Sequence, residues 1–384
     1  MKRLVMVMVA LALVAAACGG GSSGAQSAAD DCALGEVDGD LNFYNWTDYI
    51  AVGLGAEEAE VRDLVADFEA EFGVKVIHTE YSSNEAMLQQ IDAGVAYDVV
   101  VPSDYMVTTM READLLVELN SDAVPNMANI SELFADPPYD PGNQFSAPYL
   151  WGTTGIGYKY GSIDDSNGVS WASIFDPEQA AQNAGSISLL NDTRETLGSA
   201  LIYLGYSLNT TNEAEVDEAV QLIVDTKDKI LAFNSTDYWT LLSSGEVDVA
   251  QGWSGDFFAE YYAISTYDDD GNVTYDGWDD FTYAIPIEGS AAWVDTVAIP
   301  TTAEHPCTAQ AFINYLLDGE NGAELSNYNY YASPNGAAQE FIWDEVLLDE
   351  TINPPPDVMA KLEFFQDLGD FNNYYADAFL RAKG

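Results

Sequence analysis

Three tryptophans of this chain each precede an aspartate by two or three positions, and the pairs lie far apart: Trp46 with Asp48, Trp253 with Asp256, and Trp293 with Asp295. An aromatic face attracts a cation through its quadrupole, and a carboxylate adds a charge-assisted hydrogen bond. A tryptophan next to an aspartate therefore suits an organic ammonium group. Because each pair ends or adjoins an apolar run typical of a strand, we expect one cation-binding site gathered from distant parts of the chain.

A second pair of acids suggests a different chemistry. Asp192 and Glu195 lie three positions apart, where an apolar strand-like run meets a predicted helix, so they could face one cleft together. Glycosidases use two carboxylates between aromatic walls, and an exported glycosidase that uses Asp192 and Glu195 is the enzymatic alternative. Asp192 could instead cap the following helix, with Glu195 completing the capping arrangement.

Other catalytic motifs do not occur in the sequence. It contains no phosphate-binding loop and no dinucleotide-binding glycine fingerprint, and Gly252-Trp253-Ser254-Gly255 lacks the spacing of a nucleophile elbow. Only His78 and His305 could serve as a catalytic base or a nitrogen ligand for a metal. We therefore expect no catalytic residue, no cofactor and no metal ion.

The N-terminus indicates export. Lys2 and Arg3 precede an apolar run from Leu4 to Ala16, which is shorter than the roughly twenty residues that span a membrane. Small residues then lead to Cys18, and this arrangement resembles a bacterial lipoprotein signal in which that cysteine is lipidated. We expect a signal peptide with its lipobox cysteine over 1–18 and a flexible tether over 19–35. Cleavage elsewhere, as in an ordinary secreted protein, is the alternative.

Two further cysteines, Cys32 and Cys307, lie in the predicted mature chain. Disulfides form and persist outside the cytoplasm, so a bridge between these residues is expected to tie the start of the folded body to a late element. The alternative is two unpaired, small apolar side chains.

Composition excludes several classes of protein. The net charge is −52, from 64 acidic and 12 basic residues, so the chain repels nucleic acid. Since 48% of its residues are hydrophobic, it is not an acidic disordered chain. The acids are spread along the whole length, which favours a saline habitat over a cationic partner as the reason for most of the charge.

The elements that must position these residues alternate between strands and helices, which predicts parallel α/β sheets. We expect strands at 41–44, 74–77, 98–101, 156–158, 187–190, 247–252 and 297–299, and helices at 57–72, from 84, 107–113, 195–206, 213–232 and 308–317. The length predicts two domains. No linker rich in proline or glycine divides the chain, which fits domains that share strands across a hinge.

Seven runs match a known family in the same order along the chain: LNFYNWTDYI (41–50), YDVVVPSDYMV (97–107), FSAPYLWGTTGIGY (145–158), LLNDTRETLG (189–198), GWSGD (252–256), WVDTVAIP (293–300) and FINYLL (312–317). In these runs the chain resembles the spermidine/putrescine-binding proteins of polyamine ABC importers. The resemblance implies a two-lobed, periplasmic-binding-protein-like (type II) α/β fold with crossing hinge strands. Lobe 1 would comprise 36–152 and 297–338, and lobe 2 would comprise 153–296 and 339–384.

The resemblance also implies a set of ligand-binding residues. Those expected to box the carbon chain are aromatic, with two tyrosines at its ends: Trp46, Tyr49, Trp253, Trp293, Tyr105 and Tyr331. Those expected to bind ammonium groups or to add polar contacts are acids, an amide and two hydroxyls: Asp192, Glu195, Asp256, Asp295, Gln366, Thr47 and Ser103. Methylenes prefer aromatic faces, and a buried ammonium needs an anionic or hydrogen-bonding partner.

The number of acids bears on the ligand. Asp192, Glu195, Asp256 and Asp295 would leave surplus negative charge around a dication, whereas a trication matches them more closely. We therefore expect spermidine to be preferred, with putrescine or another organic amine as alternatives. The resemblance further implies a monomeric, non-enzymatic, extracytoplasmic protein that contacts the membrane only through its lipid and delivers its ligand to an ABC permease.

Overall fold

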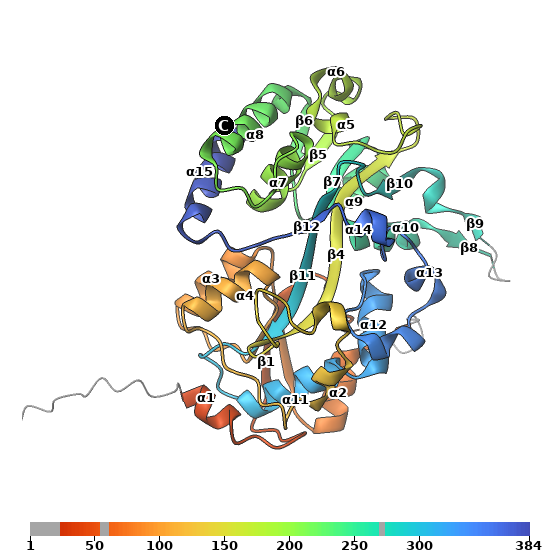
Figure 1. Cartoon of the computed structure of the whole chain (residues 1–384). Coiled ribbons are helices and arrows are strands. Elements are labelled where there is room, and N and C mark those ends of the chain that lie inside the picture. The colour runs from red at the N-terminus through yellow and green to blue at the C-terminus, as the bar shows by residue number, and fades with distance from the viewer. Residues whose placement is uncertain (1–23, 54–60, 269–272) are drawn as a thin grey trace, which may run out of the picture.

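The computed structural model describes residues 24–53, 61–268 and 273–384. The predicted signal peptide, the lipobox residue Cys18 and part of the expected helix 57–72 lie outside these ranges. Figure 1 shows two lobes connected by two long strands, β4 (Ser146–Lys159) and β11 (Ser290–Ala298), which run from one lobe into the other. The chain therefore has the two-lobed α/β architecture with crossing strands that the sequence predicted.

One continuous sheet joins the lobes, in the strand order β2-β1-β3-β11-β4-β7-β5-β6. The lobe 1 strands are β1 (Leu41–Trp46), β2 (Val76–Tyr81) and β3 (Val99–Val100), and those of lobe 2 are β5 (Ile187–Leu189), β6 (Ile230–Phe233), β7 (Val249–Trp253) and β10 (Phe281–Ala284). β1 pairs in parallel with β2 and β3, and β5 pairs in parallel with β6 and β7. The crossing strands β4 and β11 are antiparallel to each other.

Helices cover the sheet in both lobes (Figure 1). In lobe 1 they are α1 (Gly24–Ala29), α2 (Leu64–Phe72), α3 (Asn84–Asp92), α4 (Asp104–Glu112), α11 (Pro306–Leu316), α12 (Gly319–Asn329) and α13 (Asp344–Leu347). In lobe 2 they are α5 (Ala172–Phe175), α6 (Pro177–Ala180), α7 (Thr193–Tyr203), α8 (Glu213–Thr226), α9 (Tyr238–Ser244), α10 (Ser254–Ile264), α14 (Pro356–Met359) and α15 (Asn372–Lys383).

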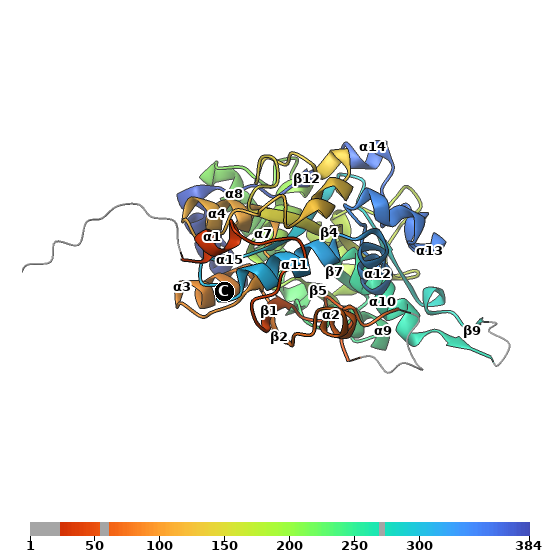
Figure 2. The ribbon, with the colours of Figure 1, turned by 90° about the horizontal axis from the view of Figure 1, so that it is seen from below.

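Two further pairs of strands are short. β12 (Leu362–Phe364) pairs in parallel with the start of β11, so the chain passes between the lobes a third time near its C-terminus. β8 (Thr266–Tyr267) and β9 (Val273–Tyr275) form a separate two-stranded sheet that projects from the body of the molecule in both views (Figure 1, Figure 2).

Local signals account for several element boundaries and for the errors in our predictions. The helix expected over 57–72 begins at Leu64, because the Asp63 side chain accepts a hydrogen bond from the backbone N–H of Ala66 and caps the helix there. It ends at Gly73, whose φ of 71° is the left-handed conformation that glycine adopts readily. The strand expected over 74–77 lies at 76–81, where it pairs with the whole of β1.

Two other boundaries were wrong because tertiary pairing overrides local pattern. The helix expected over 213–232 ends at Thr226. Residues 230–233 are not helical but form the strand β6, which pairs with β5. The strand expected at 156–158 is only the end of the 14-residue strand β4. Because β4 is buried almost throughout, it lacks the alternation of polar and apolar residues that marks a half-exposed strand.

A disulfide joins Cys32 to Cys307, with their Cα atoms 5.3 Å apart. It fastens the segment that follows α1 to the first turn of α11. Beside it, Asp38 accepts a hydrogen bond from the backbone N–H of Thr308 at 3.0 Å. The N-terminal segment of the folded body is therefore anchored to lobe 1.

The segment after residue 338 bears on where the chain leaves lobe 1. The Asn327 side chain of α12 accepts a hydrogen bond from the backbone N–H of Trp343 at 2.9 Å and donates to the Phe341 carbonyl at 3.3 Å. Residues 341–343 thus pack with lobe 1, whereas the sequence analysis assigned residues from 339 onward to lobe 2. We propose that the chain leaves lobe 1 between α13 and β12.

Candidate functional site

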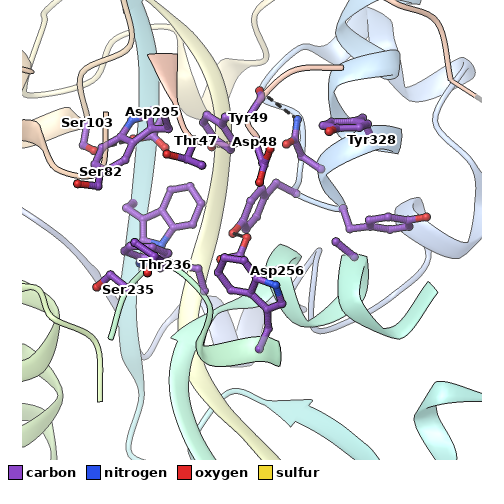
Figure 3. Close-up of a pocket in the computed structure, with 18 of the residues that line it drawn as sticks. Thr47, Asp48, Tyr49, Ser82, Ser103, Ser235, Thr236, Asp256, Asp295 and Tyr328 are labelled. Atoms are coloured by element: carbon purple, nitrogen blue, oxygen red, sulfur yellow. Dashed lines mark hydrogen bonds between the residues drawn. The ribbon is translucent and has the colours of Figure 1, made fainter. Parts of the chain in front are cut away.

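A cavity of about 810 Å³ lies between the lobes, where strands of both halves of the sheet end (Figure 3). Ligands of open α/β sheets bind in such crevices at strand ends. All but one of the residues expected to bind the ligand line it: Trp46, Thr47, Tyr49, Ser103, Tyr105, Asp192, Glu195, Trp253, Asp256, Trp293, Asp295 and Tyr331. The fold therefore gathers the three tryptophan–aspartate pairs at one place.

Gln366 is the exception. It is exposed and is not among the residues that line the cavity. Its backbone carbonyl accepts a hydrogen bond from Arg194 at 3.0 Å, and its backbone N–H donates to Asn209 at 3.0 Å. The structure therefore does not place Gln366 in the wall of the cavity, and a contact between its side chain and the ligand stays a prediction.

The aromatic walls are held by hydrogen bonds and ring contacts. Trp46 Nε1 donates to the Val101 carbonyl at 2.9 Å, which fixes its ring against lobe 1. The ring of Trp293 meets that of Tyr331 edge-on, with centroids 5.0 Å apart. Trp293 Nε1 is buried and has no hydrogen-bond partner among the described residues. An unpartnered donor in a buried cavity costs free energy, so this N–H suits a ligand or a water molecule.

Asp295 is the most fully buried acid at the lobe 1 side of the cavity. It lies in β11 where the pairing register with β4 shifts, and Ser103 Oγ donates to Asp295 Oδ1 at 2.6 Å. Asn84 Nδ2 donates in turn to Ser103 Oγ at 2.9 Å. Burial raises the pKa of Asp295 to about 6, and the Ser103 hydroxyl partly opposes that rise. A cation beside this carboxylate would replace the lost hydration.

Asp192 and Glu195 present two acids from the start of α7 in lobe 2. Asp192 Oδ1 accepts hydrogen bonds from the backbone N–H groups of Arg194 at 2.9 Å and Glu195 at 3.0 Å, so Asp192 caps the helix while it lines the cavity. Glu195 does not complete a capping box: its Oε1 accepts from Trp253 Nε1 at 2.9 Å. Its Oε2 has no partner in the described part of the chain. Burial and the charge of Asp192 raise the pKa of Glu195 to about 8.

Asp256 is the third acid that lobe 2 contributes, at the start of α10. Tyr238 donates to Asp256 Oδ2 at 2.5 Å and Tyr331 donates to Oδ1 at 3.0 Å. Burial raises the pKa of Asp256 to about 6, and both phenols oppose the rise by stabilising the anion. Since Tyr331 belongs to lobe 1, this carboxylate also links the two lobes.

Sequence reasoning missed Arg194, a cation inside a site built for cations. It is buried, and its guanidinium lies 5.2 Å from the ring centroid of Phe365 and 5.1 Å from that of Tyr375. It also donates to Asn209 Oδ1 at 2.8 Å. Its position in the run LLNDTRETLG gave no indication of a role, because its ring and carbonyl partners are distant in sequence.

Other residues of the cavity were also missed. They are aromatic or polar and come from strand ends, helices and loops that only the fold brings together: Tyr81, Ser82, Asn84, Ser235, Thr236, Trp239, Tyr262, Asn327, Tyr328, Asn329, Tyr330 and Trp343. Two of the lining residues, Asp48 and Tyr330, have positive φ angles of 53° and 55°. Non-glycine residues rarely adopt this conformation, and it clusters at functional sites.

The side chains that line the cavity indicate what kind of ligand it can hold. Four buried or half-buried carboxylates face aromatic rings, and burial is the largest cause of the raised pKa of each. Among the described residues there is no cluster of histidine, cysteine and acidic side chains that could hold a metal. The structure also describes no helix long and apolar enough to cross a membrane. The arrangement suits capture of an elongated organic cation.

Comparison with protein families gives an independent result. Residues 63–352 match the family described as bacterial extracellular solute-binding protein. The chain is 32% identical over 345 residues to the spermidine/putrescine-binding periplasmic protein of Escherichia coli, covering 89% of this chain and 91% of that protein. It is 34% identical over 379 residues to the putrescine-binding periplasmic protein SpuD of Pseudomonas aeruginosa, covering 96% and 95%.

A solved structure agrees with the fold. The structure of the spermidine/putrescine ABC transporter substrate-binding protein PotD from Streptococcus pneumoniae superimposes with a TM-score of 0.71 at 31% identity, covering 90% of this chain and 99% of that one. These relatives are described as binding and transport proteins. The comparison therefore excludes the glycosidase alternative for Asp192 and Glu195.

Proposed function

The chain belongs to the bacterial extracellular solute-binding proteins, which act outside the cytoplasm and are not enzymes, and we propose that its solute is a polyamine. The polyamine lies in the cavity between the lobes. Its carbon chain packs against Trp46, Trp253 and Trp293, and its ammonium groups bind the carboxylates around them. The relatives named above, which bind spermidine or putrescine, support this choice of solute.

One observation carries the proposal. Four carboxylates with raised pKa values converge on a cavity walled by aromatic rings from both lobes: Asp192, Glu195, Asp256 and Asp295. Bringing ionised carboxylates together in a buried cavity is unfavourable without positive charge, and a bound cation offsets that free-energy cost. A linear amine supplies both the charges and the methylenes that suit the rings.

We propose that spermidine is preferred to putrescine. Once a bound amine has favoured their ionised forms, the four carboxylates leave surplus negative charge around a diamine, whereas a triamine carries one more ammonium and matches them more closely. The open Oε2 of Glu195 and the unpartnered Nε1 of Trp293 provide further polar contacts along the cavity. Arg194 neutralises part of the charge near Asp192, which leaves putrescine as the alternative ligand.

The remaining parts of the proposal concern transport. The monomeric protein delivers its ligand to an ABC permease, and a lipid on Cys18 holds it at the outer face of the membrane. Lobe 1 and lobe 2 close around the ligand and open to release it, with β4, β11 and the segment around β12 as the hinge.

Isothermal titration calorimetry with spermidine and putrescine tests the solute. We expect saturable binding of spermidine at one ligand per chain in both 0.1 M and 1 M salt, with putrescine binding more weakly. Molar salt matters because a chain of net charge −52 attracts polycations over its whole surface, and that attraction is screened. The absence of saturable binding of either amine at both salt concentrations would exclude the proposed function.

A further inference from the structure

The cavity continues past the carboxylates described above, along the outer part of α10. Asp256, Ala259, Glu260 and Ala263 all line it, at helical positions i, i+3, i+4 and i+7. These positions fall on one face of a helix, so this face of α10 forms one wall. We call the space along it the α10 groove. None of its residues beyond Asp256 was expected from the sequence to contact the ligand.

The opposite wall of the α10 groove comes from lobe 1. Tyr328, Tyr330 and Trp343 line the same cavity, and the rings of Tyr262 and Tyr330 stack across the lobes with centroids 4.7 Å apart and planes 13° from parallel. In Figure 3, Tyr328 and Asp256 lie on one side of the cavity, and Ser103 and Asp295 lie on the other. The α10 groove therefore prolongs the cavity away from Asp295.

Spacing along α10 indicates what the groove can hold. Side chains at i and i+4 of a helix have Cβ atoms roughly 5–6 Å apart, so Asp256 and Glu260 offer two carboxylates about that far apart. Successive nitrogens of a linear polyamine are separated by four or five bonds of about 1.5 Å, which span roughly 5–6 Å when extended. The two acids therefore match consecutive ammonium groups of one amine.

The side chains around Glu260 fit this assignment. Glu260 is only partly buried, and Ser243 donates a hydrogen bond to its Oε1, which orients the carboxylate. The small side chains of Ala259 and Ala263 leave room beside it, and the rings of Tyr328 and Tyr330 provide aromatic surface for methylenes. A cation at this position would be attracted by both Glu260 and the tyrosine faces.

We propose that the α10 groove is an additional subsite for the fourth ammonium group of a tetraamine such as spermine, with Glu260 as its carboxylate. This inference rests on the proposed function, because spermine must first occupy the cavity as spermidine does. The extra aminopropyl arm then runs along α10 from Asp256 to Glu260.

The test compares spermine with spermidine on matched variants. We expect Glu260→Gln to weaken spermine binding about fivefold to tenfold, less than the loss of a fully buried charge-assisted contact because Glu260 is only partly buried, and spermidine binding less than twofold. Ala263→Leu, which fills the α10 groove without removing charge, should show the same selectivity. Glu213→Gln, an exposed acid on the remote helix α8, should leave both amines unchanged.

Calorimetry in 1 M salt measures these affinities, and unchanged spermidine binding shows that each variant is folded. Three results would overturn this subsite but not the proposed function. They are equal losses for the two amines, no loss of spermine affinity in Glu260→Gln, and failure of spermine to bind a protein that binds spermidine. Failure of the wild-type protein to bind any of these amines would instead exclude the proposed function.

Discussion

At the scale of single residues, the acids of the cavity are held in an environment that disfavours their charged forms. Glu195 is the extreme case, because burial and neighbouring Asp192 raise its pKa to about 8. A bound ammonium would reverse both effects, since it restores a favourable partner for the anion. Polyamine binding near neutral pH should therefore release a proton from Glu195.

The first prediction concerns this proton. Calorimetry at pH 7 in two buffers of different ionisation enthalpy should show proton release from the wild-type protein on binding spermidine. Glu195→Gln should release fewer protons and bind spermidine about tenfold to a hundredfold more weakly, because a charge-assisted contact is lost. Glu178→Gln, an exposed acid at the start of α6, is the matched control and should behave as wild type. Equal proton release in all three proteins would contradict this role of Glu195.

A second prediction concerns Asp256. Its two oxygens accept hydrogen bonds from Tyr238 and Tyr331, so the anion is already oriented toward the cavity. Asp256→Asn removes one negative charge, which a triamine needs more than a diamine does. The variant should lose more affinity for spermidine than for putrescine in parallel titrations. The opposite order would count against charge matching as the basis of ligand preference.

The sequence allowed many of these residues to be predicted, and the reason is chemical. A tryptophan followed by an aspartate is recognisable wherever it occurs, so Trp46, Trp253 and Trp293 could be assigned before their proximity was known. Arg194 and Glu260 could not, because their roles depend on side chains brought near them by the fold. The ligand contact of Gln366 stays a prediction, because in the structure its backbone carbonyl accepts a hydrogen bond from Arg194 and the residue does not line the cavity.

At the scale of elements, the start of α10 in lobe 2 packs tightly against lobe 1. A Cβ atom added at Gly255 would lie 2.3 Å from the Asn329 carbonyl oxygen and 2.7 Å from the Tyr331 ring. Asn329 and Tyr331 belong to lobe 1, whereas α10 belongs to lobe 2. The lobes can approach this closely only because residue 255 has no side chain.

The third prediction follows from that contact. Gly255→Ala should hold the lobes apart and weaken spermidine binding at least about tenfold, while the melting temperature of the unliganded protein changes little, because opening relieves the clash. Small-angle X-ray scattering should show less compaction on adding spermidine than in wild type. Gly24→Ala is the control, because an added Cβ there meets nothing within 4 Å. Wild-type affinity and compaction in Gly255→Ala would contradict this account of closure.

Helices and strands were predicted well where nearby residues, such as a capping side chain, set their ends. They were predicted poorly where pairing with a distant strand sets their ends. The start of the helix at Asn84 was predicted correctly, and Ser83 caps it through a hydrogen bond from the N–H of Ala86. The full length of β4 and the strand β6 were missed, because both depend on partners distant in sequence. The crossing strands were expected only from family resemblance and the absence of a linker.

At the scale of the whole molecule, the acids of the cavity should make stability depend on pH. The pKa values are raised to about 8 for Glu195 and about 6 for Asp256 and Asp295. Such groups bind protons more tightly in the folded than in the unfolded state. Their stabilising contribution is therefore fully present below about pH 4 and is lost as pH rises through 6 and then through 8.

The fourth prediction concerns how the melting temperature of the protein depends on pH. In 1 M salt, which screens surface repulsion, the melting temperature of the unliganded protein should fall between pH 5 and pH 8.5. Saturating spermidine should reduce that fall, because it stabilises the ionised acids. Glu195→Gln should lose part of the decrease between pH 7 and pH 8.5. If the wild-type and Glu195→Gln curves have the same pH dependence over that range, the buried acid is not the cause.

The central claim is that a polyamine binds between the lobes, with its chain among the tryptophans and its ammonium groups on the buried acids. A crystal structure of the protein with spermidine tests it most directly. We predict one spermidine in the cavity, with its chain against Trp46, Trp253 and Trp293 and its nitrogens within hydrogen-bond distance of Asp192, Glu195, Asp256 or Asp295. A cavity without spermidine in crystals where the amine occupies other acidic surfaces would contradict the account.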